Sequence, residues 1–216
     1  MPISVVTGGS GFIGSHLVDL LAAEDHEVRV VDDLSGGHLS NLNKHRDNPK
    51  ISLHEQNINL LEANEKVFHK ADFCFHLAGI GEIVPSIEKP MSYITTNVIG
   101  TTKMLEASQN NLVNKFVYAA SSSCYGLAKT PTSEIHKIDP LYPYAMSKYQ
   151  GEKLCFHWHK LYKLPVNSIR IFNAYGPRML PDDGRVAYTP DETAPNDWYN
   201  IIGYSKLGDR VMRVDM

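Results

Sequence analysis

Three glycines, Gly8, Gly11 and Gly14, recur at regular intervals between an apolar run and a stretch with helical spacing. The pattern predicts a buried strand over 3–7, a tight turn, and a helix over 12–23. The first glycine permits the turn, the second lets the backbone approach a pyrophosphate, and the third lets the helix pack closely on the sheet. Free N–H groups at a helix start favour negative charge. A plain glycine turn is the alternative.

The next predicted strand, Val28–Val31, ends at Asp32. A strand, a glycine turn, a helix and a second strand make up a βαβ unit of the expected length. A carboxylate at the end of the second strand accepts hydrogen bonds from both ribose hydroxyls and repels a 2′-phosphate. Asp32 therefore favours NAD over NADP as the dinucleotide.

Strands and helices alternate along the rest of the chain. Alternation of this kind predicts an α/β fold of the Rossmann type, a doubly wound parallel sheet with helices on both faces. Residues 179–216 show little periodicity and are expected to form loop with one short helix, so we divide the chain into a dinucleotide-binding domain, 1–178, and an atypical tail, 179–216. The further strands are expected over 51–53, 73–79, 116–120 and 166–172, and the further helices over 60–69, 91–108 and 142–161.

Composition argues against several classes of partner. The formal net charge is −3, which does not favour a nucleic-acid partner. No apolar run reaches about 18 residues, and the N-terminal residues lack a basic leader pattern, so we expect no membrane span and a cytoplasmic location.

Cys74, Cys124 and Cys155 are scattered and are expected to be reduced, structural thiols. His157 and His159 point to different sides of a helix, so no metal site is predicted.

A tyrosine and a lysine one helical turn apart, Tyr144 and Lys148, supply candidate acid–base groups. A free tyrosine has a pKa of about 10 and must fall by roughly 3 units to act as a base near neutral pH. A neighbouring ammonium contributes to that shift. Ser121 follows a predicted strand, at the sheet edge where ligands bind, and its hydroxyl can hydrogen-bond the reacting oxygen. Tyr-x-x-x-Lys alone is also common on surface helices.

These pieces together resemble the extended short-chain dehydrogenase/reductase family, and within it the NAD-dependent nucleotide-sugar epimerases and dehydratases. The matching segments run in family order from residue 2 to residue 178. They are 7–14, 32–34, 57–58, 76–79, 97–101, 121–126, 144–148 and 170–178.

The resemblance implies a role for each matching residue. Ser121 and Tyr144 form the catalytic pair with Lys148, and Ser122, Ser123 and Asn173 meet the nucleotide-sugar substrate. A homodimer through a four-helix interface is implied as well. The residues implied to line the NAD site, besides Gly8, Gly11 and Gly14, are Phe12, Ile13, Asp32, Asp33, Leu34, Ser35, Gly36, Gly37, Asn57, Ile58, Leu77, Ala78, Gly79, Ile80, Gly81, Asn97, Ser121, Tyr144, Lys148 and Phe172.

The residues after Ser121 indicate the reaction. Related 4,6-dehydratases carry Asp-Glu there and decarboxylating relatives carry Glu, whereas this chain has Ser122 and Ser123. The pattern is similar to that of 4-epimerases, which act through a transient 4-keto sugar. The expected substrate is a UDP-hexose or a UDP-N-acetylhexosamine.

Two other readings stay open. Residues 179–216 contain no counterpart of the family's Gly-Asp-Gly…Arg-Asp segment, which belongs to the lobe that grips the sugar nucleotide. The second hypothesis is therefore that the chain is a truncated, catalytically silent NAD-binding module, or a fragment that depends on a partner. A reductase that makes a deoxy or keto sugar is the third reading.

Overall fold

A computed structural model describes residues 1–129, 131–179, 200–203 and 212–215. Six parallel strands form one sheet in the order β3-β2-β1-β4-β5-β6. This order reverses between β1 and β4, so the chain winds outward in both directions from the centre. The predicted α/β doubly wound fold is confirmed. The strands are β1 (Ile3–Thr7), β2 (Glu27–Asp32), β3 (Ile51–Glu55), β4 (Phe73–His76), β5 (Lys115–Ser121) and β6 (Val166–Ile171).

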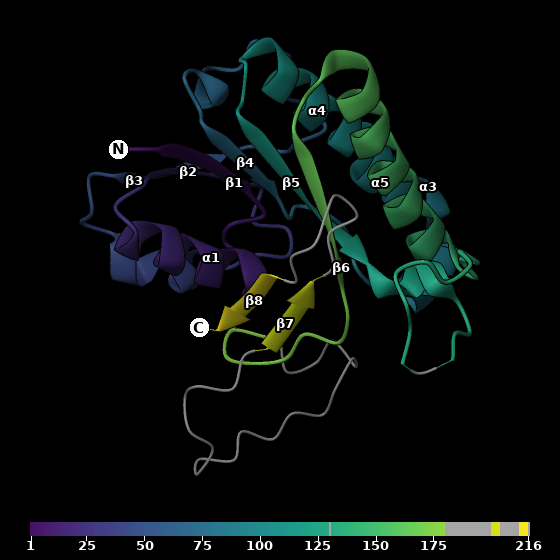
Figure 1. Cartoon of the computed structure of the whole chain (residues 1–216). Helices are drawn as coiled ribbons and strands as arrows, with labels where there is room; N and C mark the ends of the chain where they lie inside the picture. Colours follow the sequence, from purple (N-terminus) through teal and green to yellow (C-terminus); the bar gives the residue numbers. More distant parts are fainter. Residues whose placement is uncertain (130, 180–199, 204–211, 216) are drawn as a thin grey trace.

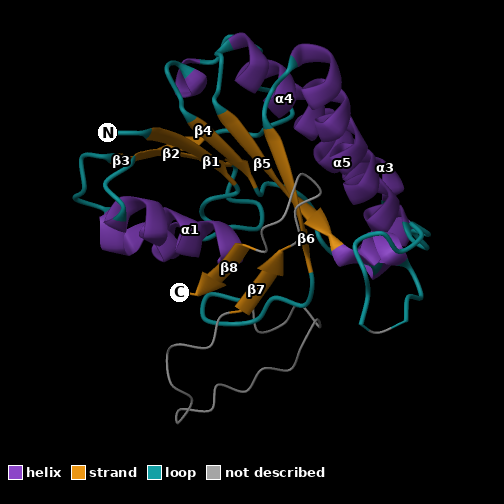
Figure 2. Ribbon diagram, viewed as in Figure 1, coloured by secondary structure: helices purple, strands orange, loops and turns teal. Residues whose placement is uncertain are grey.

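Helices cover both faces of the sheet (Figures 1 and 2). One face carries α1 (Phe12–Ala23) and the 3-10 helix η1 (Leu39–His45). The other face carries the helices that follow β4 and β5. These are α2 (Val84–Glu88), α3 (Pro90–Ile94), η3 (Thr95–Gly100), α4 (Thr101–Asn110) and α5 (Pro143–Tyr162), with the short 3-10 helices η2 (Lys66–Phe68) and η4 (Ser122–Tyr125) at the ends of loops.

Two hydrophobic clusters hold these layers together. The larger one lies between the sheet and the layer of α4 and α5, and Phe68, Met104 and Phe116 are fully buried in it. The smaller one lies beneath α1 and contains Val6 and Val30. Apolar side chains on both faces of the central strands explain why these strands appear in the sequence as near-continuous apolar runs.

The helix predicted over 60–69 is wrong, since only η2 is helical there. Side chains of α4 and of the residue that caps it donate to backbone carbonyls that a regular helix would use internally. The Nζ of Lys103 donates to the carbonyl of Leu61 at 3.0 Å, and the Nδ2 of Asn111 donates to that of Ala63 at 3.3 Å. Tertiary contacts therefore hold the part of this segment before η2 as a loop despite its apolar spacing.

The helix predicted over 91–108 is present, but its middle turn is irregular. The π-helical segment η3, Thr95–Gly100, lies between α3 and α4 without a break in the helical path. A π turn contains one more residue than an α turn and often lies at functional sites. Asn97 lies inside it.

Of the tail 179–216, the structure describes two strands, β7 (Asn200–Gly203) and β8 (Met212–Asp215), which pair antiparallel beside the end of β6 (Figure 1). None of the described residues of the tail is helical. Apart from Met179 and the two strands, the tail lies outside the described residues. Among the described helices, none is both long enough and apolar enough to cross a bilayer.

Candidate active site

The glycine turn after β1 leaves no room for a side chain at Gly8 or at Gly14. Gly8 has φ +70°, and a Cβ there would lie 2.7 Å from the backbone nitrogen of Ala78. A Cβ on Gly14 would lie 2.1 Å from the carbonyl oxygen of Gly8. The first turn of α1 therefore packs directly on the loop, with its N-terminal N–H groups at the carboxyl edge of the sheet. This geometry fits the pyrophosphate of a dinucleotide.

Asp32 lies at the end of β2 and is buried. Its Oδ2 accepts a hydrogen bond from the backbone N–H of Ser10 at 2.8 Å, and its Oδ1 accepts one from Leu34 at 2.9 Å. The carboxylate thereby ties the glycine turn to the loop after β2, and its remaining lone pairs are available to ribose hydroxyls.

Two more of the predicted cofactor residues meet beyond Asp32. The Nδ2 of Asn57 donates to Oδ2 of Asp33 at 2.7 Å, joining the loops after β3 and β2. Next to Asn57, Ile58 is buried, and a Cβ on Gly100 would lie 2.7 Å from its Cδ1. The π segment therefore packs directly against Ile58, one of the residues predicted to line the NAD site.

Asn97, in the π segment, organises the turn after β4. Its Oδ1 accepts a hydrogen bond from the N–H of Ile80 at 2.8 Å, and its Nδ2 donates to the carbonyl of Ile80 at 2.9 Å and to Oγ of Ser147 at 3.0 Å. A Cβ on Gly79 would lie 2.9 Å from Asn97 Oδ1 and 3.5 Å from the Nζ of Lys148. Gly79, Asn97 and Lys148, predicted from separate motifs, thus come together.

Lys148 is 7% exposed, although it carries a charge. Burial lowers the pKa of its ammonium to about 8. The Nζ lies 4.6 Å from the centre of the Tyr118 ring, within the range of a cation–π interaction. A positive charge is thus held at the end of the parallel strands, where substrates bind in this class of fold.

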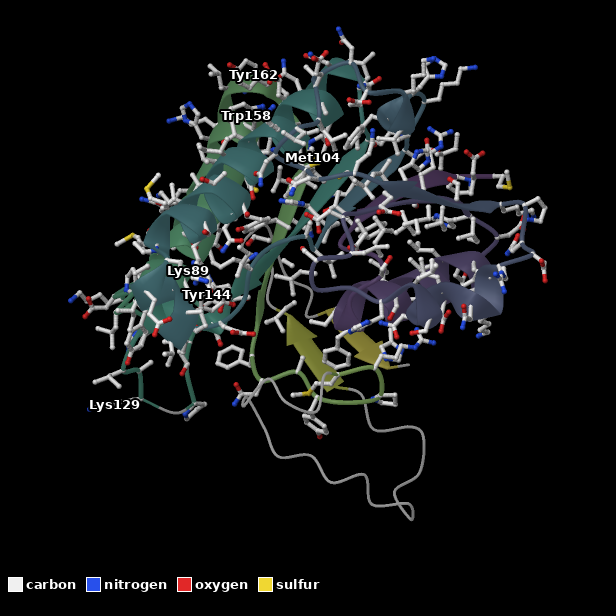
Figure 3. The ribbon with its side chains drawn as sticks, turned by 180° about the vertical axis from the view of Figure 1, so that it is seen from behind. Lys89, Met104, Lys129, Tyr144, Trp158 and Tyr162 are labelled. Carbon is white, nitrogen blue, oxygen red and sulfur yellow. The ribbon has the colours of Figure 1, made fainter. Side chains whose placement is uncertain are left out.

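One of the two candidate catalytic hydroxyls ends β5, and the other lies on α5, the helix that carries Lys148. Ser121 ends β5 and is buried, and its Oγ accepts a hydrogen bond from the N–H of Ser123 at 3.1 Å. Tyr144, labelled in Figure 3, lies in the first turn of α5, one turn before Lys148. Its ring contacts that of Tyr93 edge-on. Helix α5 packs against both β5 and η4, which brings these residues to one edge of the sheet.

The predicted substrate residues follow the same edge. Ser122 and Ser123 form the first turn of η4 and are partly exposed. Asn173 follows β6 and is exposed. Phe172, which precedes it, stacks on Tyr125 with a centroid distance of 6.4 Å. The remaining residues predicted to line the NAD site lie at the start of α1 or in the loops after β2 and β4. They are Phe12 and Ile13 in α1, Ser35, Gly36 and Gly37 after β2, and Leu77, Ala78, Ile80 and Gly81 after β4.

The cysteines are buried and free of disulfide bonds, as predicted. Burial raises the pKa of Cys124 to about 11, so this thiol next to the serine run stays protonated. In the described part of the chain, no group of three or more His, Cys, Asp or Glu residues is placed to hold a metal ion.

His76, interpreted from the sequence as structural, is fully buried between Thr7 of β1 and Thr101 of α4. Thr101 Oγ1 donates to the carbonyl of Asn97, so it accepts from the Nε2–H of His76 at 2.9 Å. The Nδ1 of His76 then accepts from Thr7 Oγ1 at 2.7 Å, and Thr7 Oγ1 accepts from the N–H of Ala78 at 3.2 Å. This network assigns a neutral imidazole with its proton on Nε2.

The sequence interpretation did not include Tyr118 and Ser147, which contact Lys148 and Asn97. The signal for Tyr118 was a polar aromatic residue at an inward position of a buried strand, two residues after Phe116. A buried tyrosine hydroxyl requires a hydrogen-bond partner, and such a position indicates a polar cluster below the surface.

The chain is similar in sequence and in fold to known proteins. The UDP-glucose 4-epimerase of Mycolicibacterium smegmatis is 36% identical over 82% of this chain and 58% of its own length. The UDP-N-acetylglucosamine 4-epimerase of Methanobrevibacter ruminantium, solved with UDP-N-acetylmuramic acid, superposes with a TM-score of 0.80 at 32% identity, over 84% of this chain and 58% of that one. The UDP-glucuronic acid 4-epimerase of Bacillus cereus, solved with NAD, gives a TM-score of 0.78 at 31% identity, over 83% and 59%.

The chain thus spans about three fifths of the length of these relatives. A family model matches residues 4–189, nearly all of the described part. These residues include the glycine turn, Asp32 and the Tyr144–Lys148 turn of α5. The chain therefore belongs to the NAD dependent epimerase/dehydratase family.

Proposed function

We propose that the protein is an NAD-dependent 4-epimerase of a nucleotide sugar, a UDP-hexose or a UDP-N-acetylhexosamine. The observation that carries the proposal is the buried Lys148 ammonium beside Gly79, at the sheet edge that also carries Ser121 and the glycine turn. NAD, when bound, supplies reversible hydride acceptance at carbon 4 of the sugar. The 4-epimerase names of the similar proteins support the same reaction.

The protein's own groups would handle the proton. Tyr144 takes the proton of the sugar 4-hydroxyl, and the ammonium of Lys148, one turn further along α5, favours the phenolate that this requires. Ser121 donates a hydrogen bond to the reacting oxygen. A transient 4-keto sugar results, and the proton returns from Tyr144 when the opposite face of carbon 4 is reduced.

The residues after Ser121 favour epimerisation over elimination. Ser122 and Ser123 carry no carboxylate, so no acid–base pair follows the catalytic serine to remove water or to assist loss of CO₂. This absence supports the epimerase over a dehydratase or decarboxylase. The choice of sugar and the phosphate contact of Asn173 are part of the proposal.

The division into a cofactor domain, 1–178, and a tail, 179–216, is proposed on the same grounds, as are the NAD-lining residues. A homodimer through a four-helix interface, formed in each copy by the helices over 91–108 and 142–161, is proposed because exposed apolar side chains, Met146 and Leu161, lie along α5. Light scattering of the purified chain tests it, and a monomeric mass would refute it. The cytoplasmic location stays a prediction.

The test combines cofactor binding with turnover. Thermal unfolding is followed with NAD⁺ and with NADP⁺, and ligand at about 100 times its Kd should add roughly 2.7 kcal/mol of stability. Proton NMR then follows UDP-glucose and UDP-N-acetylglucosamine for the appearance of the 4-epimer. We expect Tyr144→Phe to slow turnover by roughly 10²- to 10⁴-fold with NAD⁺ binding intact.

The outcomes separate the readings. An NAD⁺-selective shift with turnover supports the epimerase. A shift without turnover of either sugar supports the catalytically silent NAD-binding module or partner-dependent fragment. Absence of any shift refutes both. Net reduction of a keto sugar by NADH, without epimer formation, would instead favour the reductase.

A further inference from the structure

A row of polar residues crosses the sheet behind the candidate site. Thr7, His76, Tyr118 and Ser168 are paired in register on β1, β4, β5 and β6. All four are buried, and their side chains contact one another or the helical layer. The rings of His76 and Tyr118 lie 5.8 Å apart.

Tyr118 makes two contacts with Lys148. Its ring face lies under the ammonium, with the Nζ 4.6 Å from the ring centre. Its hydroxyl donates to the main-chain carbonyl of Lys148 at 3.2 Å. One side chain therefore contacts both the charge and the backbone of the same residue.

Gly151 makes this arrangement possible. It lies three residues after Lys148 on α5, and a Cβ there would lie 2.3 Å from the hydroxyl oxygen of Tyr118 and 2.9 Å from the carbonyl oxygen of Asn97. Glycine inside a helix costs roughly 0.5–1 kcal/mol relative to alanine. The space that this glycine leaves is occupied by the Tyr118 hydroxyl.

We propose that Tyr118 is a positioning residue for Lys148. The ring of Tyr118 holds the buried ammonium at the sheet edge that carries the predicted NAD site, and its hydroxyl fixes the turn of α5 that carries Lys148. The inference rests on the proposed function only for the catalytic role of Lys148. The π face of an aromatic ring attracts a cation more strongly when water is excluded. Removing the ring therefore withdraws a contact that favours the charged form.

The other titratable groups around Lys148 do not replace this contact. His76 on β4 is neutral, and Cys155 on α5 stays protonated because burial raises its pKa. Glu152 on α5 is engaged by Ser168 and Arg170. Tyr144 is the proposed proton acceptor itself. Burial keeps Tyr118 protonated by raising the pKa of its phenol, so it acts as a neutral ring and a donor.

Direct titration of Lys148 tests the proposal without any activity assay. The full chain is labelled with ¹³C at lysine Cε, and the resonance of Lys148 is assigned by its loss in Lys148→Met. We expect the pKa of Lys148 in the wild type to lie near 8. In Tyr118→Leu it falls by about one further pH unit, whereas in Tyr118→Phe, which keeps the ring, it stays within about 0.3 unit of the wild-type value.

Phe116→Leu is the matched control. Phe116 lies two residues earlier on β5 and is as deeply buried as Tyr118, so its replacement removes a similar ring from the same core. We expect no shift of the Lys148 pKa in this variant. An unchanged or raised pKa in Tyr118→Leu, or an equal fall in Phe116→Leu, would overturn the role of the ring.

A second readout tests the hydroxyl. In Tyr118→Phe the amide protons around Lys148 should exchange with solvent about tenfold faster, because the carbonyl of Lys148 loses its side-chain donor. Unchanged exchange would overturn this part of the proposal. Both measurements are made on the cofactor-free chain, so an absence of epimerase turnover would refute the proposed function and leave this inference standing.

Discussion

Arg170 on β6 and Glu152 on α5 form a buried ion pair. The Nε of Arg170 lies 3.1 Å from both carboxylate oxygens of Glu152, and its Nη2 lies 2.9 Å from Oε2. Arg170 also donates to the hydroxyl of Tyr125 at 2.7 Å and lies over its ring. The pair fastens the helix that carries Tyr144 and Lys148 to the strand that leads to Asn173.

Removing the carboxylate of this pair should destabilise the fold. Glu152→Gln leaves the Arg170 guanidinium buried without its counter-charge, and we expect a loss of about 3 kcal/mol in the free energy of unfolding, measured with urea. Asp139→Asn, in the exposed Lys137–Asp139 pair, is the control and should change it by less than about 0.5 kcal/mol. Equal effects in the two variants would contradict the prediction.

Gly14 should not tolerate a methyl group. In Gly14→Ala the new Cβ lies 2.1 Å from the Gly8 carbonyl oxygen, so the glycine turn has to shift, and we expect a loss of about 2–3 kcal/mol in unfolding free energy. Gly36→Ala serves as the stability control, because nothing lies within 4 Å of the added carbon. If both variants unfold at the same urea concentration as the wild type, the close packing is not needed.

Stability should fall in acid because of His76. Burial, with a contribution from the Lys148 charge, lowers the pKa of His76 to about 3, whereas an unfolded histidine has a pKa of about 6.5. Between these values the unfolded chain binds one more proton, so this contribution is fully present above pH 6.5 and declines by about 1.4 kcal/mol per pH unit below it.

Urea unfolding at a series of pH values between about 4.5 and 7.5 measures that slope, because this range includes both the constant stability above pH 6.5 and the decline below it. In His76→Gln the slope should be smaller by about one proton. His69→Gln, at an exposed position, should keep the wild-type slope. An unchanged slope in His76→Gln would show that His76 is not the responsible group.

Gly151→Ala should be destabilising even though alanine favours helices. Intrinsic propensity contributes about 1 kcal/mol in favour of alanine, but the overlap with the Tyr118 hydroxyl costs roughly 1–3 kcal/mol or more. Adding Tyr118→Phe removes the overlapping oxygen and should recover part of the loss. Simple additivity of the two changes in a double-mutant cycle would argue against the contact.

The sequence was informative where local chemistry determines the conformation. The glycine turn, Asp32 and the alternation of strands and helices need only short-range reasoning, and the sheet has the predicted organisation. The helix prediction over 60–69 failed because Leu61 is buried from a loop and Val67 and Phe68 from the short η2, while α4 donates a hydrogen bond to the carbonyl of Leu61. Spacing alone does not reveal such contacts.

The candidate site was predictable residue by residue but not as an arrangement. Motifs named Asn97 and Lys148, yet nothing local indicated that Asn97 would bond to both backbone groups of Ile80. Tyr118 and Glu152 were missed because their partners are distant in sequence. A charged residue such as Arg170 inside a buried strand was the available hint, since a buried charge requires a partner.

The π segment changes the direction in which side chains point along the helical path of α3, η3 and α4. Each α-helical residue advances the azimuth by about 100°, so one surplus residue in the turn Thr95–Gly100 puts the two halves out of phase. The half before it directs Tyr93 toward the Tyr144 ring, and the half after it places Met104 and Leu105 in the core. The irregular turn thus lets the two halves of the helix present differently oriented faces to Tyr144 and to the core. A regular α-helix would have to make both contacts with one continuous apolar face.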